Sequence, residues 1–427
     1  MYCGNCFRDN ALVHELRRLG HSTLMIPLYL PMTLDERDES MGTPIFFSGI
    51  NVYLEQLFPM FAKAPNWIRR PLASPTLLKW AAGRAARTRA QDLGELTNSI
   101  IRGEHGNQSA ELEELITWLK SNHQPDVICL SNALLAGMVR KLKEELDVPV
   151  VCVLQGEDSF LDSLPEPHRT QAWNALSERA RDIDSFIAPS NYFAQLMTRR
   201  LNLSPDRVRV VYNGINLEGF APAPTPPQTP AVGFFARMCP EKGLHLLVNA
   251  FIELKERGRV PGLLLLIGGS LGPTDEAFVA ELKKLLESHD CLQDVEFFPN
   301  LNRAEKQAFF QKLNLFSVPA MYGEAFGLYL AESWASGIPV VQPRHAAFPE
   351  LVEASGGGVI VEGNAGALAD GLEELLTNPE RMRELGRRAR DAAIEQFNVE
   401  SMTRGVLDVF ADTIASAPVR RQAALQR

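Results

Sequence analysis

Two glutamates bracket a Phe-Gly pair at the start of an expected helix. In VPAMYGEAFGLYLAESWASGIPVV, Glu324 falls in the loop before the helix and Glu332 about two turns into it, on roughly the same face. Backbone N–H groups at a helix N-terminus receive anions, and carboxylates accept hydrogen bonds from sugar hydroxyls. The pattern fits a phosphorylated sugar ligand, although most glutamate pairs at this spacing are only surface residues of an amphipathic helix.

Two basic residues follow an apolar run upstream of this segment. The strand-like AVGFFAR ends at Arg237, and Lys242 comes at the start of the next helix. A guanidinium fork and an ammonium that reach one point suit a diphosphate whose negative charge grows as it departs. Either residue alone would indicate a solvated surface, but the pair on one strand-to-helix turn predicts a phosphate site.

Four segments of the chain resemble the retaining, metal-independent glycosyltransferases of family 4, which have the GT-B fold. They are RMCPEKGLHLLVNAF, VEFFPNL, LFSVPAMYGEAFGLYLAESWASGIPVV and FPELVE, in the order and spacing of that family, and the resemblance is strongest over residues 185–361. It implies an α/β protein with two Rossmann-like domains facing across a cleft. It also implies transfer of a sugar from a UDP-, GDP- or ADP-sugar to a sugar, lipid or small-molecule acceptor, with no cofactor and no metal.

The resemblance also assigns roles to individual residues. Glu324 and the backbone N–H groups that follow it would hold the donor sugar and phosphates, Glu332 the ribose, and Leu301 the base. In a front-face mechanism the departing phosphate accepts the acceptor's proton, so the catalytic set would be Arg237, Lys242 and Glu324. The residues that would supply the remaining donor contacts are Phe326, Gly327 and Leu328.

The acceptor side is predicted from two short segments in the first half of the chain. Gly4 and Asn5, in a turn before the first helix, stand where the family has a glycine-rich loop, and a plain capping turn is the alternative. Gln155, in QGEDSF, stands where many relatives carry a histidine, and an amide cannot transfer a proton at neutral pH. Glu157 and Asp158 would either assist the sugar or simply cap the next helix.

Three further patterns are weak candidates for chemistry. Asp182-Ile-Asp184 is a DxD, but its place at a helix end favours two carboxylates that cap a turn over a metal site. Cys3 and Cys6 form a CxxC that lacks the second pair a zinc site needs. His345, in a loop after a strand, could reach the donor sugar or be an ordinary surface histidine.

Composition limits the protein's class. At 427 residues with 45% hydrophobic content the chain is long enough for two domains, and its net charge of −9 argues against a nucleic-acid binder. Six scattered cysteines are typical of a reducing cytoplasm. The longest apolar runs, such as GLLLLIGG, are too short to cross a bilayer.

One segment departs from the acidic character of the chain. The span from Lys63 to Arg89 contains several basic residues and no acidic one. It could contact an acidic acceptor or the inner face of an anionic membrane, or it could be a solvated helical hairpin.

The α/β alternation predicts the domain boundaries. We expect an acceptor-side domain over residues 1–218, a Pro-rich linker over 219–230, a nucleotide-sugar-binding domain over 231–396, and a returning helix with a basic tail over 397–427. The usual opening strand is absent before the first helix, which indicates either a longer natural chain or an exposed sheet edge. TLMIPLYL, residues 23–30, reads as the next strand.

The sequence is also compatible with two other functions. Gln155 and the missing first strand would also fit a nucleotide-sugar-binding or scaffolding relative with impaired catalysis. Some GT-B proteins are nucleotide-sugar epimerases, and the donor-side motifs do not exclude that chemistry.

Overall fold

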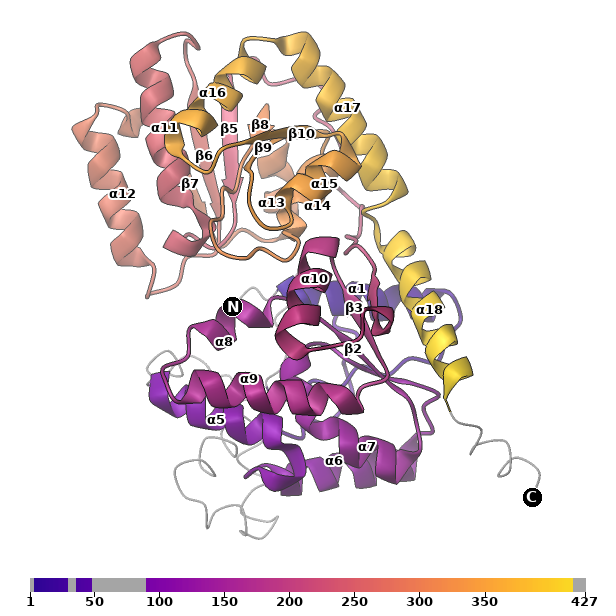
Figure 1. Cartoon of the computed structure of the whole chain (residues 1–427). Coiled ribbons are helices and arrows are strands. Elements are labelled where there is room, and N and C mark those ends of the chain that lie inside the picture. The colour runs from indigo at the N-terminus through magenta and orange to yellow at the C-terminus, as the bar shows by residue number, and fades with distance from the viewer. Residues whose placement is uncertain (1–3, 30–35, 48–89, 418–427) are drawn as a thin grey trace. The chain divides into compact units, whose positions relative to one another are not determined.

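The computed structural model describes residues 4–29, 36–47 and 90–417 (Figure 1). The span from Lys63 to Arg89, for which membrane contact was considered, lies outside these residues, and so does Cys3. Of the helices that are described, none is both long and apolar enough to cross a membrane.

The chain divides into two compact units. The N-terminal unit comprises Asn5–Pro189, Phe193–Val211 and Thr403–Arg427, and the C-terminal unit comprises Met1–Gly4, Ser190–Tyr192 and Tyr212–Met402. The Pro-rich stretch over residues 221–230 contains no helix or strand and lies within the C-terminal unit. The predicted boundary at residue 218 and the linker role of that stretch stay predictions.

The C-terminal unit contains a parallel six-stranded sheet in the order β10-β9-β8-β5-β6-β7. This is the doubly wound order of a Rossmann-like fold, in which ligands bind beyond the carboxyl ends of the strands. The strands are apolar along most of their length because helices cover both faces. They are β5 (Ala231–Phe235), β6 (Leu264–Gly269), β7 (Val295–Pro299), β8 (Leu315–Phe316), β9 (Val340–Pro343) and β10 (Gly358–Val361).

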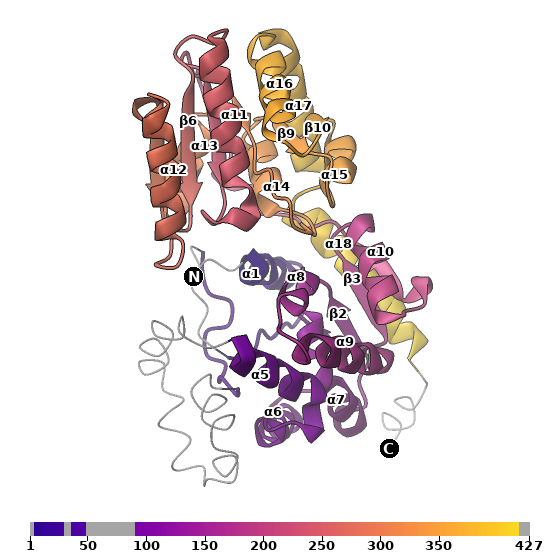
Figure 2. The same cartoon turned by 60° about the vertical axis from the view of Figure 1, so that its left-hand side comes forward.

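Helices cover the two faces of this sheet (Figure 2). α11 (Leu244–Arg257) packs between α12 (Glu276–Ser288) and α16 (Ala365–Leu376), and α14 (Leu328–Ala335) packs against α17 (Pro379–Glu395). α13 and α15 complete the set, with bounds Arg303–Phe310 and Phe348–Ser355. The core between these layers includes the fully buried Trp334, whose ring centroid lies 4.9 Å from that of Phe397.

The N-terminal unit contains a parallel four-stranded sheet in the order β1-β2-β3-β4. Its strands are β1 (Ile128–Leu130), β2 (Val150–Val153), β3 (Ser185–Ala188) and β4 (Val208–Val210). Its helices include α5 (Ala90–Arg102), α6 (Ser109–Asn122), α7 (Val139–Leu146), α8 (Glu157–Asp162), α9 (His168–Arg179) and α10 (Asn191–Leu201). From Thr403 onward α18 (Val399–Ser416) belongs to this unit, which confirms the prediction of a returning C-terminal helix.

The start of the chain differs from two predictions. Gly4 and Asn5 do not form a turn before the first helix, because they are the first residues of α1 (Gly4–Arg18). Residues 23–29 of the predicted strand TLMIPLYL form no strand. A strand needs a neighbour with which to form a ladder of hydrogen bonds, whereas Leu28 accepts a single bond at 2.9 Å from the backbone N–H of Phe47.

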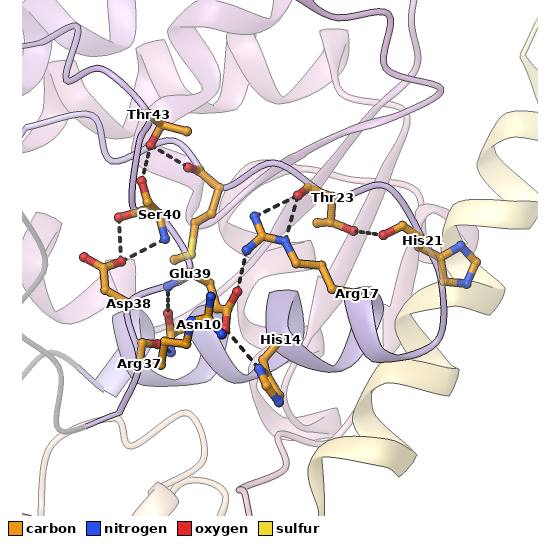
Figure 3. Close-up of polar contacts among 11 residues, drawn as sticks. Asn10, His14, Arg17, His21, Thr23, Arg37, Asp38, Glu39, Ser40 and Thr43 are labelled. Atoms are coloured by element: carbon orange, nitrogen blue, oxygen red, sulfur yellow. Dashed lines mark hydrogen bonds and ion pairs between the residues drawn. The ribbon is translucent and has the colours of Figure 1, made fainter.

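Side chains of α1 hold the residues that follow it (Figure 3). Asn10 donates to the carbonyl of Arg37 and accepts from the N–H of Glu39, both at 2.9 Å. His14 lies 3.0 Å from the Glu39 carboxylate, which also accepts a hydrogen bond from Arg17. These contacts attach residues 36–43 to α1 without any sheet pairing.

Candidate active site

The candidate site lies at the carboxyl ends of the strands in the C-terminal unit. Because these strands are parallel, the loops that follow them meet at one edge of the sheet. Arg237 and Lys242 follow β5, Asp275 follows β6, and Glu324 follows β8. The fold therefore brings basic and acidic side chains from separate loops to one edge.

Lys242 and Glu324 form a largely buried ion pair at this edge. The Lys242 Nζ lies 2.7 Å from Oε2 of Glu324, whose side chain is only 11% exposed. Tyr329 donates to the same oxygen at 2.8 Å, and Tyr322 donates to it at 3.1 Å. Since all three contacts fall on Oε2, Oε1 is the oxygen on which a ligand hydroxyl can bind.

Burial and charge pairing oppose each other in this pair. Burial alone would raise the pKa of Glu324, but the Lys242 ammonium and the hydrogen bonds outweigh it and the pKa is lowered. Burial alone would lower the pKa of Lys242, but the Glu324 carboxylate outweighs it and the pKa is raised. Both side chains are therefore charged at neutral pH.

Arg237 is held by a second carboxylate. Its Nε donates to Oδ2 of Asp275 at 2.8 Å and its Nη2 donates to Oδ1 at 2.9 Å, a bidentate geometry. Asp275 is buried, with a side chain 7% exposed, while the Arg237 side chain is 55% exposed. The guanidinium is thus fixed along the edge that bears Nε and Nη2, and its Nη1 takes no part in the ion pair.

Lys306 and Glu332 form the third pair. The Lys306 Nζ donates to Oε1 of Glu332 at 2.8 Å, and both side chains are mostly buried. The same Nζ lies 5.9 Å from the ring centroid of Phe235, the last residue of β5, so this pair also lies near the β5 end of the sheet. The prediction that Glu332 is two turns into its helix was wrong, because α14 begins only at Leu328.

Phe326 and Gly327, just before α14, offer only backbone groups to a ligand. Phe326 is 2% exposed and packs against Phe397, with ring centroids 6.1 Å apart, so only its backbone can meet a ligand. Gly327 caps the helix with a φ of 82°, and the first N–H groups of a helix lack intrahelical acceptors. Leu328 and Leu301 are half-buried at the same edge of the sheet.

Among the predicted acceptor-side residues, Gly4 belongs to the C-terminal unit, and the others, from Asn5 onward, belong to the N-terminal unit. The side-chain amide of Gln155 donates to the carbonyl of Ser131 at 2.8 Å. Glu157 is buried and accepts hydrogen bonds from the backbone N–H groups of Ala133 and Gln155, at 2.7 and 2.8 Å. Neither N–H belongs to α8, and the N-cap of that helix makes no side-chain bond, so the alternative that Glu157 caps the helix was wrong. Asp158 is buried as well, and its Oδ1 has no hydrogen-bond partner among the residues that the structure describes.

The DxD aspartates are engaged in ion pairs. Asp182 pairs with Arg140 at 3.0 Å, and Asp184 pairs with Lys143 at 2.7 Å while accepting the N–H of Val150. These contacts give both carboxylates a structural role at the turn before β3. His345 is half-buried in the loop after β9, where its backbone N–H donates to the carbonyl of Pro343.

Two protein families match adjoining parts of this chain. Residues 81–218 match the family described as Glycosyltransferase Family 4, and residues 218–392 match the family described as Glycosyl transferases group 1. The chain belongs to the family 4, group 1 glycosyltransferases.

Individual relatives of this family 4 chain are distant. It is 30% identical to the putative colanic acid biosynthesis glycosyltransferase WcaL of Escherichia coli K12, over 56% of this chain and 58% of that protein. It is 27% identical to a D-inositol 3-phosphate glycosyltransferase of Segniliparus rotundus, over 87% of each. The solved structure of Anabaena HepE in complex with UDP has a TM-score of 0.63 at 18% identity, over 73% of this chain and 84% of that one.

These relatives confirm the fold. The likeness to HepE, and to sucrose-phosphate synthase of Thermosynechococcus elongatus with a TM-score of 0.61 at 20% identity, supports the predicted GT-B architecture. The chain spans 58% of the length of WcaL, so the activity of that protein does not pass directly to this one.

Sequence reasoning missed four side chains at the site. Tyr322 and Tyr329 lie within the quoted motif, and their positions on either side of Glu324 were a usable signal. Asp275 follows a Gly-Gly strand end, where a buried acid is a reasonable partner for Arg237. Lys306 carries no local signal, because a lysine on an amphipathic helix is usually solvated.

The Lys242–Glu324 pair predicts a specific dependence of stability on pH. Because folding lowers the pKa of Glu324 from 4.5, its contribution is present above that value and is lost as pH falls through the folded pKa. Because folding raises the pKa of Lys242 from 10.5, its contribution is complete below that value and is lost as pH rises through the folded pKa.

A double-mutant cycle with Lys242→Met and Glu324→Gln measures this coupling by urea unfolding. We expect a coupling free energy of about 1–3 kcal/mol that is constant from about pH 5 to 9 and shrinks below about pH 4. A coupling that changes around pH 7 would contradict the assignment.

Lys306 is predicted to orient Glu332. In Lys306→Met, Glu332 keeps a buried charge without its partner, so the free energy of unfolding should fall by roughly 1–3 kcal/mol and the KM for a nucleotide-sugar donor should rise more than kcat falls. Lys306→Arg, which keeps the charge, is the matched control and should retain more of both. Equal loss of kcat and of kcat/KM in Lys306→Met, with no change in KM, would argue against a role in donor binding.

Proposed function

We propose that this chain is a retaining, metal-independent glycosyltransferase that moves a sugar from a nucleotide diphosphate sugar to an acceptor hydroxyl. The observation that carries the proposal is that Arg237 and Lys242 both follow β5 and are each held by a buried carboxylate, and that the partner of Lys242, Glu324, lies in the loop before α14. Such a set of fixed donors favours a charge that develops on a leaving group.

The nucleotide sugar is proposed to contact hydrogen-bonding groups that the ion pairs do not use. Arg237 keeps its Nη1 donors, and Lys242 has a third N–H beyond those directed at Glu324 and Tyr322. These donors and the N–H groups before α14 would hold the diphosphate, while the second oxygens of Glu324 and Glu332 would accept hydroxyls of the donor sugar and the ribose. Leu301 would pack on the base.

The proposed step needs no side-chain base. The bond between the anomeric carbon and the phosphate oxygen breaks, the acceptor oxygen bonds to the same face of that carbon, and the proton of the acceptor hydroxyl passes to the departing phosphate. Gln155, which cannot transfer a proton, is compatible with this scheme as a hydrogen-bonding residue. Arg237 and Lys242 would then supply the main stabilisation of the leaving group.

The comparisons suggest which substrates to test first. Solved structures of HepE contain UDP and UDP-glucose, so UDP-sugars are the first donors to test, followed by GDP- and ADP-sugars. Several relatives are D-inositol 3-phosphate glycosyltransferases, and a phosphorylated polyol is therefore the first acceptor class to test. Sugar and lipid acceptors come next.

Arg237→Ala tests the leaving-group role. We expect kcat to fall roughly 100- to 1000-fold, equivalent to about 3–4 kcal/mol, because one preorganised donor to the departing phosphate is lost. The measurement is the rate of nucleoside diphosphate release with and without acceptor. Arg387→Ala, at an exposed arginine of α17, is the matched control and should keep the rate of the unchanged protein.

Two results would contradict the proposal. Undiminished turnover in Arg237→Ala would remove that residue from the chemistry. Tight nucleotide-sugar binding by the unchanged chain, with neither transfer nor slow donor hydrolysis for any acceptor, would favour a binding or scaffolding protein.

Metal removal provides a separate test. Because hydrogen-bond donors of Arg237 and Lys242 are proposed to stabilise the departing diphosphate in place of a metal ion, turnover should be the same after dialysis against EDTA and after re-addition of Mg²⁺ or Mn²⁺. Loss of turnover with EDTA and its recovery with metal would overturn metal independence while leaving sugar transfer intact.

A further inference from the structure

A polar hollow lies in the N-terminal unit, apart from Gln155 and Glu157. Its volume is about 220 Å³, and its walls come from α5, from the turn that follows α5 and from the first turn of α9. α5 and α9 lie side by side (Figure 1). The lining residues that bear on the inference are Glu95, Asn98, Ser99, Arg102, His168 and Gln171.

The floor of the hollow contains an incompletely bonded amide. Asn98 is 4% exposed, and its Nδ2 lies 3.4 Å from the carbonyl oxygen of His168 and 3.4 Å from Oε1 of Gln171, at the long limit for hydrogen bonds. Its Oδ1 is buried and has no hydrogen-bond partner among the residues that the structure describes. Buried amide oxygens are nearly always bonded, so this oxygen calls for a donor from a ligand or a water molecule.

Two glycines allow close packing of the chain beside the hollow. A Cβ at Gly94 of α5 would lie 2.7 Å from the side chain of His168, and one at Gly103, which has a φ of +60°, would lie 1.8 Å from the carbonyl oxygen of Gly137. The glycines thus set α5 and the turn after it at fixed, short distances from their neighbours. A larger residue at either glycine would have to displace its neighbour, so this close approach depends on both glycines.

The chemistry of the lining selects the class of ligand. Apart from one glycine, every residue that lines the hollow has a polar side chain, so most of its surface is polar, which disfavours a lipid chain. Glu95 and Arg102 carry opposite charges, which disfavours a strongly anionic ligand. The amides of Asn98 and Gln171 both donate and accept hydrogen bonds, as neighbouring sugar hydroxyls require.

We propose that this hollow binds one neutral sugar residue, with one hydroxyl bonded to the Gln171 amide and a second hydroxyl donating to Oδ1 of Asn98 once the buried Asn98 amide turns toward the ligand. The volume is below that of pockets for drug-sized ligands and suits a single pyranose ring. If the chain transfers sugars as proposed, the bound sugar unit is part of a saccharide acceptor or product. Binding of the sugar itself does not depend on that function.

Titration of the full chain with methyl α-D-glucopyranoside and methyl α-D-mannopyranoside, followed by ligand-observed NMR, tests the proposal. At least one glycoside should bind in the millimolar range, and Gln171→Ala should weaken that binding roughly fivefold through loss of a hydrogen bond. Asn174→Ala, at an exposed residue of the same helix outside the hollow, is the matched control and should bind as the unchanged chain does.

A second variant removes the side-chain amide of Asn98. Asn98→Leu keeps the side-chain size but removes the accepting oxygen, and it should abolish glycoside binding while its thermal unfolding confirms that the chain still folds. Binding to neither glycoside would overturn the proposal, as would equal binding by Gln171→Ala and the unchanged chain. Displacement of the glycoside by inorganic phosphate would also overturn it, in favour of an anion site.

The donor site provides the control that separates the two proposals. Glu324→Gln should impair nucleotide-sugar binding and leave glycoside binding intact, whereas Gln171→Ala should do the reverse. Failure of sugar transfer with intact glycoside binding would therefore leave this inference standing. Loss of glycoside binding in Glu324→Gln would instead place the sugar at the donor site and overturn the inference.

Discussion

The buried ion pair between Lys242 and Glu324 is the interaction on which the rest of the candidate site depends. Each charge would be costly to bury alone, and each is stabilised by the other and by the hydroxyls of Tyr322 and Tyr329. The pair joins the loop after β5 to the loop after β8. It therefore positions a cation and a carboxylate before any ligand arrives, so that a ligand need not organise them.

The same principle recurs in the two neighbouring pairs. Arg237 with Asp275 and Lys306 with Glu332 also match one cation to one carboxylate, so the three pairs carry no net formal charge. A diphosphate would then be recognised by directed donors, namely Arg237 Nη1, the third Lys242 proton and the N–H groups before α14. Fixed donors stabilise negative charge at the position where the leaving group forms. Because the site has no net positive charge, it does not attract every anion in solution. This arrangement suits a site that must release its nucleotide product after each turnover.

The sequence predicted the C-terminal unit better than the N-terminal unit, for a physical reason. Strands such as β5 and β6 are buried on both faces and read as continuous apolar runs, and the helix from Glu276 to Ser288 has the predicted bounds. Arg237, Lys242, Glu324 and Glu332 could be predicted because they follow strand ends in a recognisable order. Asp275 was missed although it follows a strand end, because its partner Arg237 is distant in the sequence, and Lys306 could not be assigned because it has no local signal.

Residues 4–29 show the limit of local pattern most clearly. The apolar run from residue 23 has the composition of a strand, but a strand exists only where a second strand completes its hydrogen bonds, and here side chains of α1 hold the following residues instead. Gly4 and Asn5 looked like a turn because glycine and asparagine favour turns, yet the helix begins at Gly4. The hollow beside α5 and α9 likewise depends on tertiary contacts, since its lining residues come from separate segments of the chain. Sequence motifs do not predict such a site, because its polar residues have no distinctive spacing in the sequence.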